Sequence, residues 1–203
     1  MQRQNAKCLL QHVVKRSDQT EYTRHHNGDT DDIIDTIMYA DARSADFVKD
    51  VSCFWRADLY ESLYQVWKAL RTQLKYRADK PGHERVKSPG ALVTSGVGDC
   101  KSFSILVGAI LRKMGIPYVY RFTAYAPGDY THVYVVAKTP DGPVIIDAVH
   151  TKYDEEVRYM KKKDIAPPQS RVSGVHGASN HNTNSVFIWA LVLFGAVQLY
   201  RAK

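Results

Sequence analysis

A cysteine, a histidine and an aspartate lie in this order along the chain, at spacings that could support nucleophilic catalysis. Cys100 follows a glycine-rich turn and Asp99, and it directly precedes a long apolar run. A thiolate at a helix N-terminus is stabilised by the helix dipole and by a neighbouring imidazole, and a third group can hold that imidazole in place. The candidates for these two partners are His132, which opens a β-rich run, and Asp147, which ends the next one. Taken singly, each of the three residues also fits a purely structural role.

The apolar run after Cys100 predicts the central helix of the fold. Its apolar residues lie on nearly all sides of the helix, which is typical of a helix that other elements cover. We expect the helix to extend from Cys100 to Met114. Gly115 then provides the usual C-terminal glycine, and Pro117 prevents the helix from continuing.

Helices are expected before this central helix and strands after it. Thr30 is expected to cap one helix, a second helical pattern covers residues 54–74, and residues 79–98 are expected to form an irregular loop. The apolar period then changes from 3.6 to 2 over the runs PYVYRFTAY, HVYVVAK and PVIIDAV, which predicts an α+β domain. Because the start of one antiparallel strand lies beside the end of the next, His132 and Asp147 are expected to be neighbours at one edge of the sheet.

The run from Val66 to Ala148 resembles the transglutaminase-like superfamily of papain-type cysteine enzymes. The matching pieces are VWKALRTQLKYRAD, HERVKSPGALV, GDCKSFSILVGAILRKMGIPY, THVYVVA and IIDAV. The resemblance implies a papain-like core with N-terminal helices, a central buried helix that starts at the nucleophile, and an antiparallel sheet. It also implies that Cys100 is the nucleophile, His132 the base and Asp147 the orienting carboxylate. Bacterial and phage-encoded cysteine peptidases of this superfamily are the closer match, because the chain has no room for the extra β domains of the large cross-linking enzymes.

The sequence offers candidates for an oxyanion donor but no pattern typical of a metal site. The backbone N–H of Cys100 is one candidate donor, because it lies at a helix start. The family also places a side-chain donor upstream of the cysteine, and Gln73 and Tyr76 are the candidates here, although Tyr76 also fits simple core packing. The histidine- and aspartate-rich stretch at residues 25–32 lacks EF-hand spacing and no CxxC pair occurs, so we expect no metal and no cofactor.

Charge and cysteine content limit the partners and the compartment. The formal charge of +7 arises mostly in residues 1–28 and 165–203, so the central part carries no basic stripe and no nucleic-acid partner is expected. Three cysteines without a secretory signal pattern indicate a reducing compartment with free thiols. Cys8 and Cys53 are therefore expected to be structural thiols, and the location to be the cytoplasmic side.

Composition changes divide the chain into four parts. These are a basic N-terminal arm (1–28), the catalytic domain (29–160), a polar linker (161–184) and an apolar C-terminal helix (185–203). A helix over the fifteen uncharged residues would be about 22 Å long, and flanking basic side chains could extend its reach across a bilayer. We expect residues 185–200 to contact a membrane, with docking into a multi-subunit assembly or onto the domain itself as alternatives. A phage-encoded protein would be virion-associated.

Two functions from different classes follow from these observations. The first is a cysteine acyl-transfer enzyme acting on a protein or peptide, in which a thioester is resolved by water (peptidase or amidase) or by an amine (transglutaminase). Hydrolysis is slightly favoured, since the additional domains of the cross-linking enzymes are missing. The alternative is a catalytically silent transglutaminase-like module that binds a partner and is tethered by its C-terminal segment. The complete set of Cys100, His132 and Asp147 argues for the enzyme.

Overall fold

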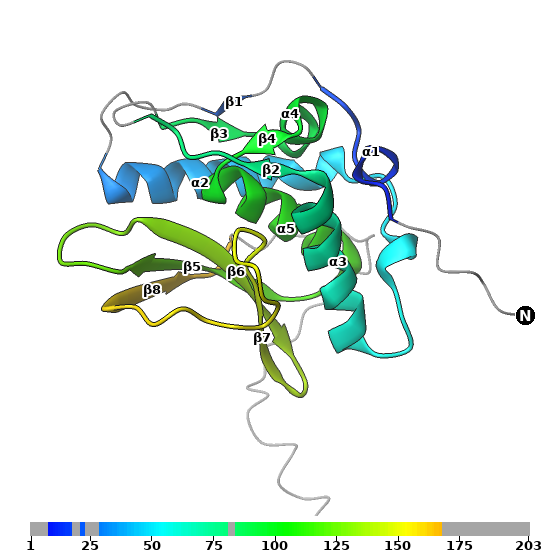
Figure 1. Cartoon of the computed structure of the whole chain (residues 1–203). Coiled ribbons are helices and arrows are strands. Elements are labelled where there is room, and N and C mark those ends of the chain that lie inside the picture. Colours follow the sequence, from blue (N-terminus) through cyan, green and yellow to red (C-terminus); the bar gives the residue numbers. More distant parts are fainter. Residues whose placement is uncertain (1–7, 18–20, 23–28, 81–83, 168–203) are drawn as a thin grey trace, which may run out of the picture. The chain divides into compact units, whose positions relative to one another are not determined.

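The computed structural model describes residues 8–17, 21–22, 29–80 and 84–167, which belong to one compact unit (Figure 1). Its elements in chain order are α1 (Leu10–Val13), β1 (Glu21–Tyr22), α2 (Thr30–Ser44), η1 (Ala45–Phe47), η2 (Ser52–Phe54), α3 (Leu59–Gln73), β2 (Lys75–Tyr76), β3 (Val86–Lys87), α4 (Pro89–Ser95), β4 (Val97–Gly98), α5 (Cys100–Met114), β5 (Tyr118–Ala124), β6 (His132–Thr139), β7 (Gly142–Ile146) and β8 (Lys161–Ile165). Helices lie against one face of an antiparallel four-stranded sheet, so the fold is α+β, as predicted.

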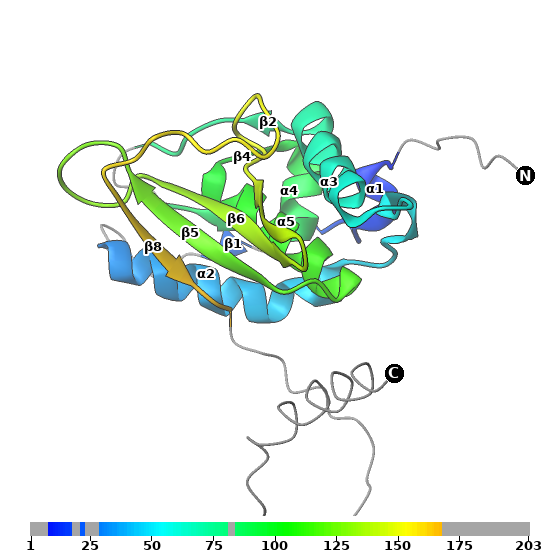
Figure 2. The same cartoon turned by 90° about the horizontal axis from the view of Figure 1, so that it is seen from below.

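Helix α5 is the centre of the fold, as its apolar sequence predicts. Thirteen of its fifteen residues are buried, because β6 and helices α2, α3 and α4 all contact it (Figures 1 and 2). The side chain of Asp99 caps its start by accepting the Ser102 N–H, and Gly115 ends it in the left-handed conformation with φ of 74°. The predicted range of the helix is confirmed.

The two long helices before α5 begin at aspartate caps. The Asp29 carboxylate accepts the backbone N–H groups of Asp31 and Asp32, so Asp29 caps α2 and the prediction of Thr30 as the cap is wrong. Asp58 caps α3 by accepting the Glu61 N–H. Both signals are local, because a short acidic side chain placed before a helix satisfies N–H groups that have no partner within the helix.

Residues 79–98, predicted to be an irregular loop, contain a helix. Ser88 caps α4 by accepting the Ala91 N–H, Pro89 occupies its first position, and Gly96 ends it with φ of 66°. The following β4 pairs in parallel with β2, which joins this segment to the end of α3. The start of α5 is therefore supported by two short elements rather than by a loop.

The main sheet has the strand order β7-β6-β5-β8, and its neighbouring strands are antiparallel. The three predicted strand runs are β5, β6 and β7, whereas β8 lies in the predicted linker. Arg121 of β5 donates from Nε and Nη2 to the two carboxylate oxygens of Asp164, each at 2.7 Å. The domain therefore continues to Ile165, and the boundary predicted at residue 160 is wrong. The lysines of this exposed edge strand also discourage pairing with another chain.

The N-terminal segment is also part of the domain. Leu10, Val13 and Val14 are almost fully buried in the main core. Cys8 forms a disulfide with Cys53, with the two Cα atoms 5.5 Å apart. The predicted free thiols at Cys8 and Cys53 are therefore wrong, and so is the domain start at residue 29. A pairing across 45 residues leaves no local signal in the sequence.

A buried carboxylate ties α2, α5 and β5 together. Asp41 has no exposed surface, and it accepts hydrogen bonds from the hydroxyl groups of Tyr118 at 2.5 Å and Tyr120 at 2.7 Å. Arg112 of α5 forms an ion pair with the same carboxylate. Gly108 lies beneath the two tyrosine rings, where a Cβ would overlap the Tyr120 hydroxyl. The sheet can approach α5 this closely only because residue 108 is a glycine.

Among the described helices, none is long and apolar enough to cross a membrane. The predicted apolar helix at residues 185–203 lies outside the described residues, as does most of the predicted linker.

Candidate active site

Cys100 is the first residue of α5, and its position is set by tight packing on the preceding turn. Its side chain is nearly buried, with 9% of the residue exposed. A Cβ on Gly98 would lie 2.5 Å from the Leu92 side chain and 3.2 Å from the Cβ of Ser102, so a larger residue would displace the helix start. The Gly98 carbonyl accepts the backbone N–H of Arg77 at 2.9 Å, which fixes the turn from the other side. The cysteine is thus held at the N-terminal end of a rigid helix.

His132 and Asp147 are neighbours, as the antiparallel pairing predicts. His132 is the first residue of β6, and Asp147 directly follows β7, which pairs with β6. The Nε2 atom of His132 lies 2.7 Å from Oδ2 of Asp147. The other carboxylate oxygen of Asp147 accepts the Val149 N–H at 3.0 Å. This second bond orients the carboxylate toward the histidine ring.

The pKa of His132 depends on both Asp147 and Cys100. Burial of the ring lowers the pKa of His132, but hydrogen bonds with Asp147 and Cys100 and the charges of both groups outweigh it and raise the pKa from 6.5 to about 10. Since Asp147 holds Nε2, the other ring nitrogen is the one left for the Cys100 thiol. The structure therefore brings together the three residues that the sequence singled out, in the order thiol, imidazole, carboxylate.

Two cavities meet at His132. One, of about 270 Å³, is lined by Ile33, Glu84, Cys100, Lys101, Phe122, Tyr130, Thr131, His132 and Val133. The other, of about 360 Å³, is lined by Tyr76, Tyr125, Thr131, His132, Asp147, Val149, His150 and Val157. Aromatic and aliphatic side chains form much of both walls. An extended polypeptide passing the imidazole could therefore place apolar side chains on either side of it.

The two predicted side-chain oxyanion donors have different surroundings. The Gln73 amide donates from Nε2 to the Cys8 carbonyl at 2.7 Å and accepts the Leu10 N–H at 3.0 Å. Both polar atoms of the Gln73 amide thus bind the backbone of the N-terminal segment. The prediction that Gln73 serves the active site is wrong. Tyr76 lines the cavity of about 360 Å³ together with His132, and its ring packs edge-on against Phe103.

Trp67 is a residue near the site that the sequence indicated only as part of a helix. Its Nε1–H donates to the Asp147 backbone carbonyl at 2.9 Å, and its indole is largely buried. The ring stacks on Tyr64 and contacts Tyr153, which forms an aromatic cluster at the end of β7. No signal in the sequence could have assigned this contact, because the two residues are 80 positions apart.

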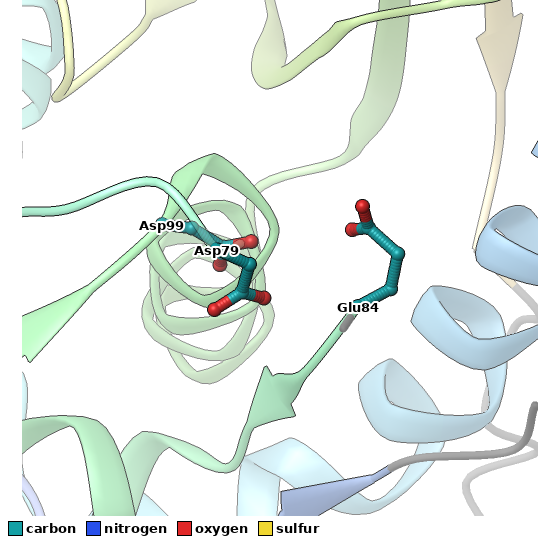
Figure 3. Close-up of side chains that lie close together, drawn as sticks. All are labelled: Asp79, Glu84 and Asp99. Carbon is teal, nitrogen blue, oxygen red and sulfur yellow. The ribbon is translucent and has the colours of Figure 1, made fainter. Parts of the chain in front are cut away.

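A cluster of three carboxylates lies next to Cys100. Oxygens of Asp79, Glu84 and Asp99 all lie within 4.8 Å of one another, and Figure 3 shows the three side chains around the start of α5. The ammonium of Lys101 forms ion pairs with all three. Asp79, Glu84 and Asp99 are separated by up to twenty positions in the sequence, and only folding brings their carboxylates together.

Comparisons with known proteins agree with the sequence resemblance. Residues 53–150 match the core of the transglutaminase-like superfamily. Similar solved structures include a protein from Cytophaga hutchinsonii described as a candidate cysteine protease, with 20% identity over 57% of this chain and 37% of that one and a TM-score of 0.39. Another is calcium-bound LapG from Legionella pneumophila, with 20% identity over 58% of this chain and 75% of that one and a TM-score of 0.43. A search of curated proteins gives no match.

Proposed function

Because residues 53–150 belong to the transglutaminase-like superfamily, we propose that this protein is a cysteine enzyme that cleaves or exchanges amide bonds in a protein or peptide. The observation that carries the proposal is the hydrogen bond between His132 and Asp147 beside Cys100, which lines the same cavity as His132. A thiol at the first residue of a helix, paired with an imidazole that a carboxylate orients, is the arrangement that acyl transfer through cysteine requires.

The reaction follows from the roles of the three side chains. The Cys100 thiolate attacks the carbonyl carbon of the amide, and the His132 imidazolium donates its proton to the departing amine as the carbon–nitrogen bond breaks. The product is a thioester on Cys100 and a neutral imidazole. That imidazole then accepts a proton from water or from an acceptor amine, which attacks the thioester and releases the thiolate. Asp147 holds the ring at Nε2 throughout.

The negative oxygen that forms during the attack needs hydrogen-bond donors. The backbone N–H of Cys100 is the first candidate, because the first N–H groups of a helix have no partner within the helix. Tyr76 is the remaining side-chain candidate, since it lines the same cavity as His132 and Asp147. Water is the acceptor that we propose first, with an amine as the alternative.

One experiment separates the outcomes. A glutamine- and lysine-containing protein substrate is incubated with the enzyme, with and without a fluorescent primary amine, and analysed by mass spectrometry. New peptide termini identify a peptidase, glutamate in place of glutamine an amidase, and incorporated amine a transglutaminase. The Cys100→Ala variant is the control and should abolish each product while remaining folded. Absence of every product over a broad panel of substrates would favour the silent binding module instead.

The disulfide supports a different compartment from the one that the cysteine count indicated. Disulfides persist in oxidising environments and are rare in the cytosol. The Cys8–Cys53 bond joins the N-terminal segment to the domain, and we place the working domain in an oxidising compartment on this ground. From the apolar sequence of residues 185–200, we also propose that this segment contacts a membrane. Mass spectrometry of the native protein, alkylated without reductant, would contradict the oxidising compartment if Cys8 and Cys53 carry the label.

A further inference from the structure

Lys101, the residue directly after the nucleophile, is unusually buried for a lysine. Only 9% of its side chain is exposed, although lysines are rarely buried without partners. Its Nζ atom lies 2.6 Å from Oε2 of Glu84 and 3.6 Å from Oδ2 of Asp79, and it forms an ion pair with Asp99. The ammonium is therefore enclosed by three carboxylates.

These carboxylates come from separate segments that a cation must hold together. Asp79 follows β2, Glu84 precedes β3, and Asp99 is the cap of α5. Three carboxylates within 4.8 Å repel one another strongly unless a cation lies between them. Oxygen-rich groups of this kind are the usual ligands of calcium and similar ions. In this protein the charge is supplied by the chain itself.

Lys101 stays charged in this environment. Burial lowers the pKa of Lys101, but the neighbouring Asp99, Cys100 and Glu84 outweigh it, so that the pKa lies above its ordinary value. The same side chain lines the cavity of about 270 Å³ together with Cys100 and His132. Lys101 thus borders the cavity, while its ammonium forms ion pairs with the carboxylates.

We propose that Lys101 is a built-in cation that occupies a three-carboxylate site in place of a divalent metal ion and thereby positions Cys100. The proposal depends on the proposed function only in taking Cys100 as the reacting group. Lys101 acts through its neighbours and is a positioning residue. Loss of its charge would leave three carboxylates beside the thiol, which oppose formation of the thiolate and push the start of α5 away from Asp79 and Glu84.

The experiment compares the wild type with Lys101→Met, which keeps the length of the side chain and removes its charge. Thermal unfolding and the rate of Cys100 alkylation by iodoacetamide are measured in EDTA and in excess calcium chloride. No reductant is needed, because Cys8 and Cys53 are joined and Cys100 is the free cysteine. Lys101→Arg preserves the charge. Lys113→Met makes the same substitution at the exposed far end of α5 and is the matched control.

Calcium dependence is the readout that a merely structural lysine would not produce. In EDTA, Lys101→Met should unfold at a lower temperature and its Cys100 should react about tenfold more slowly. Calcium should restore much of both properties in this variant and change neither in the wild type, Lys101→Arg or Lys113→Met. A wild type that calcium stabilises, or a Lys101→Met variant that behaves like the wild type in EDTA, would overturn the proposal.

A variant that fails to fold still gives an answer. Refolding of Lys101→Met with calcium should then recover native circular dichroism, and failure to do so would count against the proposal. Glu84→Gln, which removes one carboxylate and retains Lys101, should remain reactive and insensitive to calcium. None of these measurements needs a substrate, so failure of the proposed enzyme activity would be seen separately.

Discussion

Replacing Asp147 by asparagine tests the central electrostatic argument of the site. The carboxylate of Asp147 lies 2.7 Å from Nε2 of His132 and supports the protonated ring. Asparagine retains the shape of the side chain and an oxygen that can accept the Val149 N–H, but it removes the negative charge. The variant should therefore lower the pKa of His132 toward its ordinary range while leaving the fold intact.

The magnitude follows from the pKa of His132. A rise from 6.5 to about 10 corresponds to about 5 kcal/mol of preference for the charged ring, at about 1.4 kcal/mol for each tenfold change. Asp147 and Cys100 share this effect, so about 5 kcal/mol is the upper limit of what Asp147→Asn can remove. Because the folded-state pKa is raised, this stabilisation is fully present below pH 6.5 and is lost as the pH rises toward 10. The stability difference between wild type and Asp147→Asn should thus be largest near pH 6 and shrink toward pH 10.

Two measurements check this prediction. An NMR titration of the His132 ring gives its pKa directly, and urea unfolding at several pH values between 6 and 10 gives the free energy of unfolding. Asp141→Asn, an exposed position at the tip of the β6–β7 hairpin, is the matched control and should change neither. If His132 titrates near 6.5 in the wild type, or if Asp147→Asn leaves its pKa unchanged, the reasoning about the charged pair is refuted.

Three further predictions concern the surroundings of the site. Cys53→Ser removes the disulfide that closes a loop of 45 residues. In chemical denaturation, the free energy of unfolding should fall by about 2–4 kcal/mol. Added reductant should reproduce this loss in the wild type. Trp67→Phe removes the N–H that donates to the Asp147 carbonyl. We expect kcat/KM to fall about tenfold and the thermal stability to fall by only about 1 kcal/mol. An unchanged kcat/KM would contradict a positioning role for Trp67. Gly108→Ala forces a methyl group against the Tyr120 hydroxyl and should cost about 1–3 kcal/mol in urea unfolding, with no loss expected if the sheet moves away freely.

The features that were predictable from sequence are those with short-range causes. The extent of α5 follows from its cap at Asp99, its glycine at Gly115 and an apolar pattern that only a central helix can satisfy. The strands β5, β6 and β7 follow from their apolar alternation and the turns between them. The proximity of His132 and Asp147 follows from hairpin pairing alone.

The features that were missed depend on contacts between distant segments. Gln73 looked like a donor at a helix end, but the fold brings the N-terminal segment to it and uses its amide there. The strand β8 is highly charged, and its place in the sheet depends on pairing with β5 and on the ion pair between Arg121 and Asp164. Such partners are chosen by the tertiary structure, so no local pattern reveals them.

By itself, the sequence determined the immediate setting of the three candidate groups. It placed a thiol at a capped helix start and two partners on one hairpin, because caps, glycine turns and strand pairing act over a few residues. Only the tertiary structure decided how these groups are held. It placed Trp67 behind Asp147, enclosed Lys101 among three carboxylates, and joined Cys8 to Cys53. The physical reason is that buried hydrogen bonds, charges and disulfides take whichever partner folding brings within a few ångströms, however far apart the two residues lie in the chain.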